Sequence, residues 1–227
     1  MPETLLGKRP LFTVLFEIVA LWIVSDIGYY ILVPLIGDYS THPFKMAVYY
    51  LFWVVVTLIN FWAFYRHWGT IKINVSTLGV ITLACIGIAL YFYYLLPLFP
   101  ALPWVGALPP PSDLLYASSW YFLPKSIEIA LQQLLIVAMV LAFHAQEFSV
   151  HTIARWSAVL FGGMHVLLAL SGSSFIYVLV FTSAATVAGF IFPYLILRIR
   201  NGLIYSYMLQ WGFYAVIIVA ARMLLIS

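Results

Sequence analysis

Long apolar runs recur along the chain, and short polar clusters separate them. Residues 46–65 contain no charged side chain, and neither do residues 73–112. A helix needs ~20 apolar residues to cross the ~30 Å hydrocarbon core of a bilayer, and the runs lack the alternation that is typical of a membrane β-barrel. The pattern therefore predicts seven helical spans, at residues 11–37, 45–66, 74–99, 121–147, 153–171, 174–198 and 202–224.

A proline-rich segment at residues 97–119 interrupts this pattern. Its prolines are Pro97, Pro100, Pro103, Pro109, Pro110 and Pro111. Proline removes a backbone donor and clashes with the preceding turn, so no continuous helix passes through the segment. We expect a loop on the membrane face, with Trp104 and Tyr116 in the aromatic belt of the interface. The whole chain, 1–227, is expected to be a single integral membrane domain, with N-terminal spans and this loop in residues 1–119 and the functional core in residues 120–227.

The composition supports the same class of protein. Hydrophobic residues make up 65% of the chain and charged residues 7%, whereas soluble domains carry roughly 25% charged residues. We therefore expect an all-α, polytopic transmembrane helix bundle in a lipid bilayer. The formal net charge of +3 comes from scattered Lys and Arg without a basic stripe, which argues against binding to nucleic acid. A single cysteine, Cys85, excludes an intrachain disulfide and a thiolate metal cluster, and we expect no cofactor.

Basic residues are distributed unevenly between the two ends of the predicted spans. With the N-terminus in the cytoplasm, those on the cytoplasmic side are Lys8, Arg9, Arg66, Lys72, Arg155, Arg198 and Arg200. Those on the outer side are Lys45, Lys125 and Arg222. Because loops rich in Lys and Arg stay in the cytoplasm, we expect a cytoplasmic N-terminus and a C-terminus outside.

Two ionisable side chains, His165 and Glu128, lie inside neighbouring predicted spans of the C-terminal half. His165 lies within residues 156–173, which hold no charged residue, and Glu128 lies four residues after Pro124, near the start of the preceding span. A charged group inside the bilayer costs ~2.5 kcal/mol or more and therefore marks a candidate functional site. Gln132 is one turn from Glu128 on the same helical face, so we expect it to hold the carboxylate by a hydrogen bond.

The segment from Phe161 to His165 reads Phe-Gly-Gly-Met-His. With Glu128 in the preceding span, this Phe-x-x-x-His pattern resembles the second motif of the CPBP family, the CAAX proteases and bacteriocin-processing enzymes. Members of that family are glutamate intramembrane endopeptidases or their relatives in immunity and self-protection. The resemblance covers roughly the C-terminal half of the chain, which would then be a CPBP-like core.

The family's first motif is two glutamates followed, after three residues, by an arginine at the start of a membrane helix. Here Glu128 supplies one glutamate, and Ile127 or Ile129 stands where the other would be. Gln132 or Gln133 takes the place of the arginine. The first motif is therefore present in part, with its carboxylate kept and its cation lost.

The family's third motif is a histidine followed four residues later by asparagine, and here Gln210 and Tyr214 stand at those positions. The resemblance implies that Glu128 is a general base acting on a water, and that His165 orients the water or stabilises an oxyanion. Gln132 would hold the base, and Gln210 can donate to an oxyanion but cannot shuttle a proton. These replacements imply a divergent, weak or inactive endopeptidase whose substrate would be a membrane-anchored peptide.

A non-enzymatic role is the alternative interpretation. Polar residues often hold membrane helices together, and a carboxylate near a helix start is also stabilised by the helix dipole. The protein would then be an accessory or scaffold subunit that binds other membrane proteins in a larger complex. Convergence of Glu128, His165 and Gln210 on one wet cavity would favour the enzyme, whereas side chains that face different partners would favour the scaffold.

A second group of polar residues consists of His144, Glu147 and His151, at spacings of three and four. If the helix continued that far, the three side chains would share one face and could bind zinc or iron. The group lies beside Arg155, where the span leaves the membrane, and a solvated polar end is the simpler interpretation. We therefore expect no metal.

Two acidic residues, Glu17 and Asp26, interrupt the first span. They are about two and a half turns apart and face different directions. Each is expected to face the bundle interior and to pair with a polar neighbour, and Arg222 is a candidate partner for Asp26.

Overall fold

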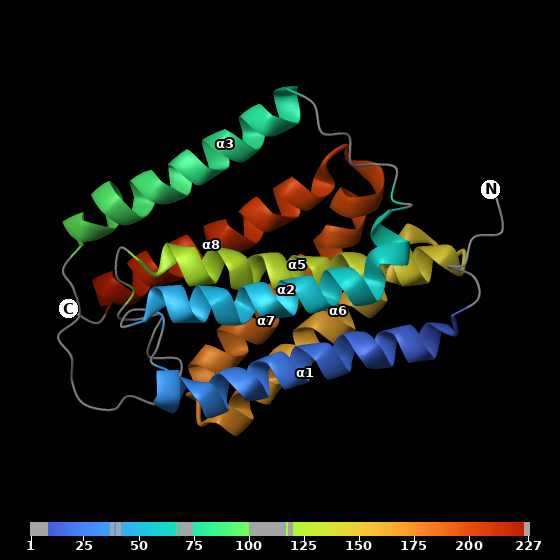
Figure 1. The fold of residues 1–227 in the computed structure, drawn as a ribbon, viewed down its shortest axis with the longest axis horizontal. Helices are drawn as coiled ribbons and strands as arrows, with labels where there is room; N and C mark the ends of the chain where they lie inside the picture. The colour runs from blue at the N-terminus through green and yellow to red at the C-terminus, as the bar shows by residue number, and fades with distance from the viewer. Residues whose placement is uncertain are drawn as a thin grey trace.

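The computed structural model describes residues 9–36, 39, 42–66, 68, 75–99, 117 and 120–224. Its α-helices are α1 (Leu11–Ile36), α2 (Pro43–Tyr65), α3 (Val75–Leu90), α5 (Phe122–Ala145), α6 (Val150–Val166), α7 (Phe175–Arg198) and α8 (Gly202–Leu224). Shorter helical turns extend α3 and α6, namely the π-helical η2 (Tyr91–Leu95) and the 3-10 turns η3 (Leu96–Leu98) and η4 (Leu167–Ser171). The all-α bundle predicted from the apolar runs is confirmed (Figure 1).

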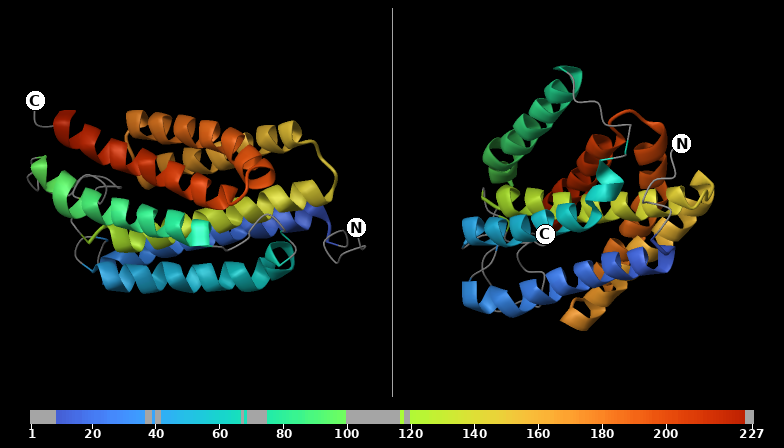
Figure 2. Two further views of the ribbon diagram at one scale, coloured as in Figure 1. Left: turned by 90° about the horizontal axis from the view of Figure 1, so that it is seen from above. Right: turned by 45° about the vertical axis from the view of Figure 1, so that its right-hand side comes forward.

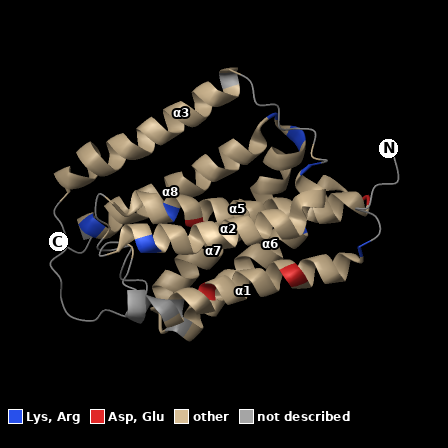
Figure 3. Ribbon diagram, in the orientation of Figure 1, with Lys and Arg blue, Asp and Glu red and all other residues tan. Residues whose placement is uncertain are grey.

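Seven helical segments are long and apolar enough to cross a membrane: Leu11–Tyr29, Pro43–Tyr65, Thr77–Leu98, Phe122–Ala145, Val150–Leu170, Phe175–Arg198 and Gly202–Met223. The protein is thus an integral, multi-pass membrane protein. Most charged residues lie toward the ends of the helices (Figure 3). Most of the predicted proline-rich loop, residues 100–116 and 118–119 with Trp104 and Tyr116, lies outside the described residues, as do Lys8 and Lys72 of the charge count.

Local sequence signals set several helix boundaries. The Ser149 hydroxyl accepts a hydrogen bond from the Thr152 backbone N–H at 3.2 Å, and Ser174 does the same for Tyr177 at 3.3 Å. Both serines satisfy a donor that the first turn of a helix leaves free. Gly172 closes η4 with a φ of 81°, a left-handed conformation that glycine adopts without a steric cost.

The central element of the bundle is α5. Of its span, 72% is buried, against 33% or less for each of the other six. It packs against α1, α2, α6, α7 and α8, as the position of its ribbon in Figure 1 indicates. Its contact with α2 joins the N-terminal spans to the C-terminal core. Polar side chains on α5 are consequently shielded from lipid by protein on most sides.

The closest helix pair is α6 with α7, which form the most extensive contact in the described structure. Glycines make this approach possible. A Cβ added to Gly162 would lie 2.1 Å from the Thr186 Oγ1, and one added to Gly189 would lie 2.7 Å from the carbonyl oxygen of Ser157. Small residues at such crossings are a common way to pack membrane helices.

The outermost element is α3, which Figure 1 and the right-hand view of Figure 2 draw at the edge of the bundle. Only 6% of its span is buried. Its main contact is with η2, the turn that continues it. Most of its surface is therefore available to lipid or to another membrane protein.

Arg222, near the end of α8, binds backbone carbonyls instead of the predicted carboxylate. Its guanidinium donates to the carbonyl oxygens of Leu96 at 3.1 Å, Phe99 at 3.4 Å and Ala117 at 2.6 Å. Leu96 lies in η3 and Phe99 directly after it, where the last carbonyl groups of a helix can accept from donors outside it. The predicted pairing of Arg222 with Asp26 is therefore wrong: both Nη atoms donate to backbone carbonyls, and among the described residues no ion pair joins Arg222 to Asp26.

Candidate functional site

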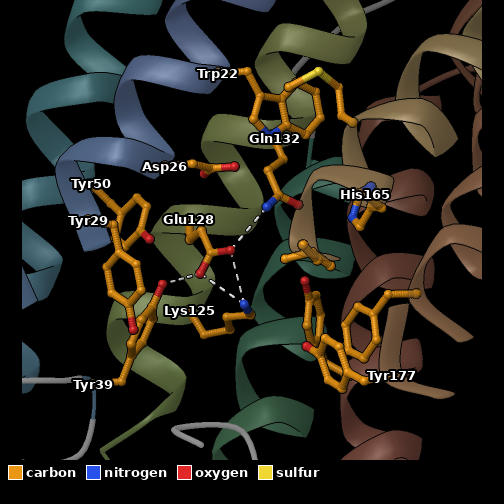
Figure 4. Close-up of a pocket in the computed structure, with 14 residues that line it drawn as sticks. Trp22, Asp26, Tyr29, Tyr39, Tyr50, Lys125, Glu128, Gln132, His165 and Tyr177 are labelled. Atoms are coloured by element: carbon orange, nitrogen blue, oxygen red, sulfur yellow. Dashed lines mark hydrogen bonds and ion pairs between the residues drawn. The ribbon is translucent and has the colours of Figure 1, made fainter. Parts of the chain in front are cut away.

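Glu128 lies in the second turn of α5, and its carboxylate is surrounded by donors. Lys125 Nζ lies 3.0 Å from Oε1 and 2.9 Å from Oε2. Gln132 Nε2 donates to Oε1 at 3.0 Å, and the Tyr39 hydroxyl donates to Oε2 (Figure 4). These contacts occupy about four acceptor sites, which is all that a carboxylate offers. The predicted hydrogen bond from Gln132 is confirmed.

Lys125 is one turn before Glu128 on α5 and is almost fully buried, with 7% of its surface exposed. Its ammonium lies 4.1 Å from the ring centre of Tyr214 and 5.6 Å from that of Tyr39. A cation over an aromatic face gains attraction from the ring quadrupole, most of all when it is desolvated. Tyr214 thus packs against the cation of this site.

A directed chain of hydrogen bonds connects α8 to Glu128. Ser206 Oγ donates to Gln133 Oε1 at 2.7 Å, and Gln133 Nε2 donates to Gln210 Oε1 at 2.7 Å. Gln210 Nε2 then donates to Gln132 Oε1, and Gln132 donates to Glu128. Each glutamine accepts through its oxygen and donates through its nitrogen. Every amide group in this buried chain therefore has at least one acceptor bond and one donor bond.

Glu128 and His165 line the same cavity, which has a volume of about 90 Å³ and also contains Asp26 and Lys125 in its wall. His165 Nδ1 donates to the Phe161 carbonyl oxygen at 2.9 Å, because a carbonyl oxygen can only accept. No hydrogen bond joins Glu128 to His165 among the residues that the structure describes. The two candidate catalytic groups therefore share a space without contacting each other through a hydrogen bond.

Gln210 does not join them in this cavity. It lines a neighbouring apolar groove between α7 and α8, and its amide nitrogen is directed at Gln132. The convergence of Glu128, His165 and Gln210 that would favour the enzyme therefore holds only for Glu128 and His165. Gln210 acts on the site through Gln132, as a helix-to-helix connection.

Asp26 on α1 is a member of the cavity that sequence reasoning did not place there. Figure 4 shows Asp26 and His165 flanking the hydrogen-bonded group around Glu128. In the described part of the chain, Asp26 makes no hydrogen bond or ion pair. Lys125 was also missed, because it was counted as a loop charge, although its spacing of three from Glu128 would place both on one helical face.

The other acidic residue of α1, Glu17, has the polar neighbours that were predicted for it. Arg9 forms an ion pair with its carboxylate, and Asn60 Nδ2 donates to it at 3.1 Å. Both side chains of the ion pair are partly exposed, at 33% and 29%. Glu17 is therefore held near a helix end, away from the cavity around Glu128.

The alternative metal site rested on a continuous helix through His144, Glu147 and His151, and this premise is wrong. The helix α5 ends at Ala145, Glu147 has a φ of 61°, and α6 begins at Val150. His151 Nδ1 lies 3.1 Å from the Tyr194 hydroxyl. Among the described residues, no three His, Cys, Asp or Glu side chains are grouped so that they could hold a metal ion.

Comparison with known proteins adds no relative to this geometry. No protein-family model, curated protein sequence or solved structure matches the chain.

Proposed function

We propose that this chain is a divergent CPBP-like membrane protein whose Glu128 site does not carry out efficient peptide hydrolysis. One observation carries the proposal, namely that the Glu128 carboxylate is occupied by Tyr39, Lys125 and Gln132. A general base needs a lone pair directed at the water that it deprotonates. Here the lone pairs are taken by donors from the same protein, one of them a cation.

The surroundings of the carboxylate support the same proposal. The glutamine chain uses Gln210, which replaces a family histidine, to connect α8 with α5. Tyr214, which replaces the family asparagine, packs on Lys125. Both replacements therefore contribute to an ion-pair cluster that joins helices. We infer that this polar cluster has lost a catalytic role and now stabilises the contact between helices.

The experiment is a cleavage assay in proteoliposomes with a fluorogenic membrane-anchored peptide. We expect the native protein and the Glu128→Gln variant to give the same background rate. General acid–base catalysis contributes ~10²–10⁴-fold, so a working site would make the two rates clearly different. Cleavage by the native protein that is lost in Glu128→Gln would show an active endopeptidase and contradict the proposal.

The resemblance to the CPBP family has a separate test. The double variant Gln210→His with Tyr214→Asn restores the third family motif and supplies an imidazole and an amide. We expect this variant to cleave the peptide faster than the native protein does, because a proton-shuttling group is returned to the site. Gln146→His, on the exposed turn between α5 and α6, is the control and should leave the rate unchanged. A double variant that folds and stays at background would argue against a decayed protease.

A non-enzymatic role as an accessory subunit is the second candidate function. The observation that favours it is the exposed face of α3, of whose span only 6% is buried. Apolar and aromatic side chains such as Leu83, Leu90 and Tyr94 are exposed there. Purification from native membranes in a mild detergent should then retain a stoichiometric partner, and Leu83→Trp on this face should release it. Purification of the chain alone would count against this role.

A further inference from the structure

The polar cavity around Glu128 adjoins a much larger apolar groove. The groove has a volume of about 690 Å³ and lies between α6, α7 and α8. The cavity and the groove share three wall residues, His165, Phe181 and Tyr214. The two spaces therefore meet at these three side chains, and a molecule that passes between them would place a small polar part in the cavity and an apolar part along the helices.

The groove suits one hydrocarbon chain. Its wall on α8 extends from Met208 to Val216, which is about 12 Å along a helix. Phe161, Ala185 and Ile191 are among the residues that line its other sides. Apolar side chains dominate this wall, and they can bind a chain by contact without providing polar recognition.

The cavity offers acceptors without partners, and these determine the polar head. Asp26 has no hydrogen bond or ion pair among the described residues. His165 uses Nδ1 as a donor to Phe161, so Nε2 of the neutral ring is an acceptor. Glu128 and Lys125 already satisfy each other. A ligand head that reaches this space therefore meets two acceptors and should itself be a donor.

Charge and aromatic surface point to a cation. The ionisable wall holds two carboxylates, Asp26 and Glu128, against one ammonium, Lys125, so the formal balance is one negative charge. Aromatic rings complete the wall, namely Trp22, Tyr29, Tyr39, Tyr50, Tyr177, Phe181 and Tyr214. Aromatic faces attract cations within about 6 Å. A protonated amine satisfies the free acceptors and balances the charge.

We propose that the cavity and groove together bind a single-chain amphiphile with a protonated primary amine as its head. The amine lies between Asp26 and His165, and the chain lies along α7 and α8. This inference goes beyond the proposed function and does not depend on it, since binding is measured without any cleavage. It assigns Asp26, which the proposed function leaves unused, to ligand recognition.

The test is equilibrium dialysis of labelled dodecylamine against the full chain in nanodiscs of zwitterionic lipid, with empty nanodiscs subtracted. We expect saturable binding, and much weaker binding of dodecanoate and of butylamine. Asp26→Asn should weaken dodecylamine binding by about tenfold or more, because a hydrogen bond to a charged group is lost. Glu17→Gln, which changes an acidic residue of the same helix outside the cavity, should bind like the native protein.

A second variant tests the groove without touching the polar cavity. Gly212 lines the groove and has no atom within 4 Å of an added Cβ, so Gly212→Phe should fold and fill the space. We expect it to abolish dodecylamine binding, whereas Gly87→Phe, at an equally open site on α3, should have no effect.

Equal binding by Asp26→Asn and the native protein, or equal binding of dodecanoate, would overturn the proposal. A saturable site must release labelled dodecylamine when unlabelled dodecylamine is added in excess. If only a lysine-bearing transmembrane peptide displaced the label, the proposal would be overturned as well.

Discussion

At the scale of single residues, the ion pair between Lys125 and Glu128 differs from an ion pair at the surface. Their side chains are only 8% and 12% exposed, so neither charge is solvated by bulk water when its partner is removed. Removing one partner of a buried pair costs about 3–5 kcal/mol, because an uncompensated charge stays behind. An exposed pair contributes only about 0–1 kcal/mol. The described structure contains both kinds, since Arg9 and Glu17 form a pair that is 33% and 29% exposed.

We predict that Lys125→Met lowers the free energy of unfolding by about 3–5 kcal/mol. The double variant Lys125→Met with Glu128→Leu should recover much of this loss, because the stranded carboxylate is removed as well. Arg9→Met is the control and should cost less than about 1 kcal/mol. Unfolding in mixed detergent micelles, followed by circular dichroism, measures all three. Equal losses for Lys125→Met and Arg9→Met would contradict a buried, mutually dependent pair.

At the scale of helices, the close contact between α6 and α7 depends on glycines, which have no side chain to keep the two backbones apart. A Cβ on Gly189 would meet backbone atoms of Ser157 and Ala158 at 2.7 to 3.0 Å. Backbone atoms cannot rotate away as a flexible side chain can, so the helices must separate. Gly163, in the same α6 helix, has nothing within 4 Å of an added Cβ.

We predict that Gly189→Ala lowers the free energy of unfolding by about 1–3 kcal/mol, the usual cost of overpacking a tight contact. Gly163→Ala should be neutral or slightly stabilising, because alanine favours the helix more than glycine does. The same unfolding measurement compares the two variants. A Gly189→Ala variant as stable as Gly163→Ala would mean that α6 and α7 are not packed this closely.

The helices were predictable from the sequence, but their facing sides were not. Apolar runs of about membrane length predicted all seven spans. The contact of Gln132 with Glu128 was predictable because both lie on one helix, four residues apart. Asp26 was missed because its surroundings depend on how α1 is rotated toward α5, whereas the spacing of Lys125 and Glu128 already placed both on one helical face. Lipid is as apolar as a helix interface, so the hydrophobic pattern of a membrane helix does not reveal its buried side.

At the scale of the whole molecule, burial changes how much each basic residue contributes to the charge difference between the two ends of the bundle. Arg66, Arg155, Arg198 and Arg200 are exposed at one end of the bundle. At the other end, Lys45 is exposed, whereas Lys125 and Arg222 are 7% and 6% exposed and are satisfied by protein groups. Buried cations contribute little to the loop charge that orients a membrane protein. Among the described residues, the bias toward the end that holds Arg9 is therefore larger than the sequence count alone indicates.

We predict that the end with Arg155 faces the cytoplasm, as the positive-inside rule requires. Single cysteines would be introduced at Gln146, between α5 and α6, and at Ser173, between α6 and α7, after replacing the native Cys85 by alanine. An impermeant thiol reagent should label Ser173→Cys in intact cells, and should label Gln146→Cys only after the membrane is permeabilised. The Cys85→Ala background should show no labelling in either condition. Labelling of Gln146→Cys in intact cells, with Ser173→Cys protected, would reverse the orientation and place the Glu128 cavity near the cytoplasmic leaflet.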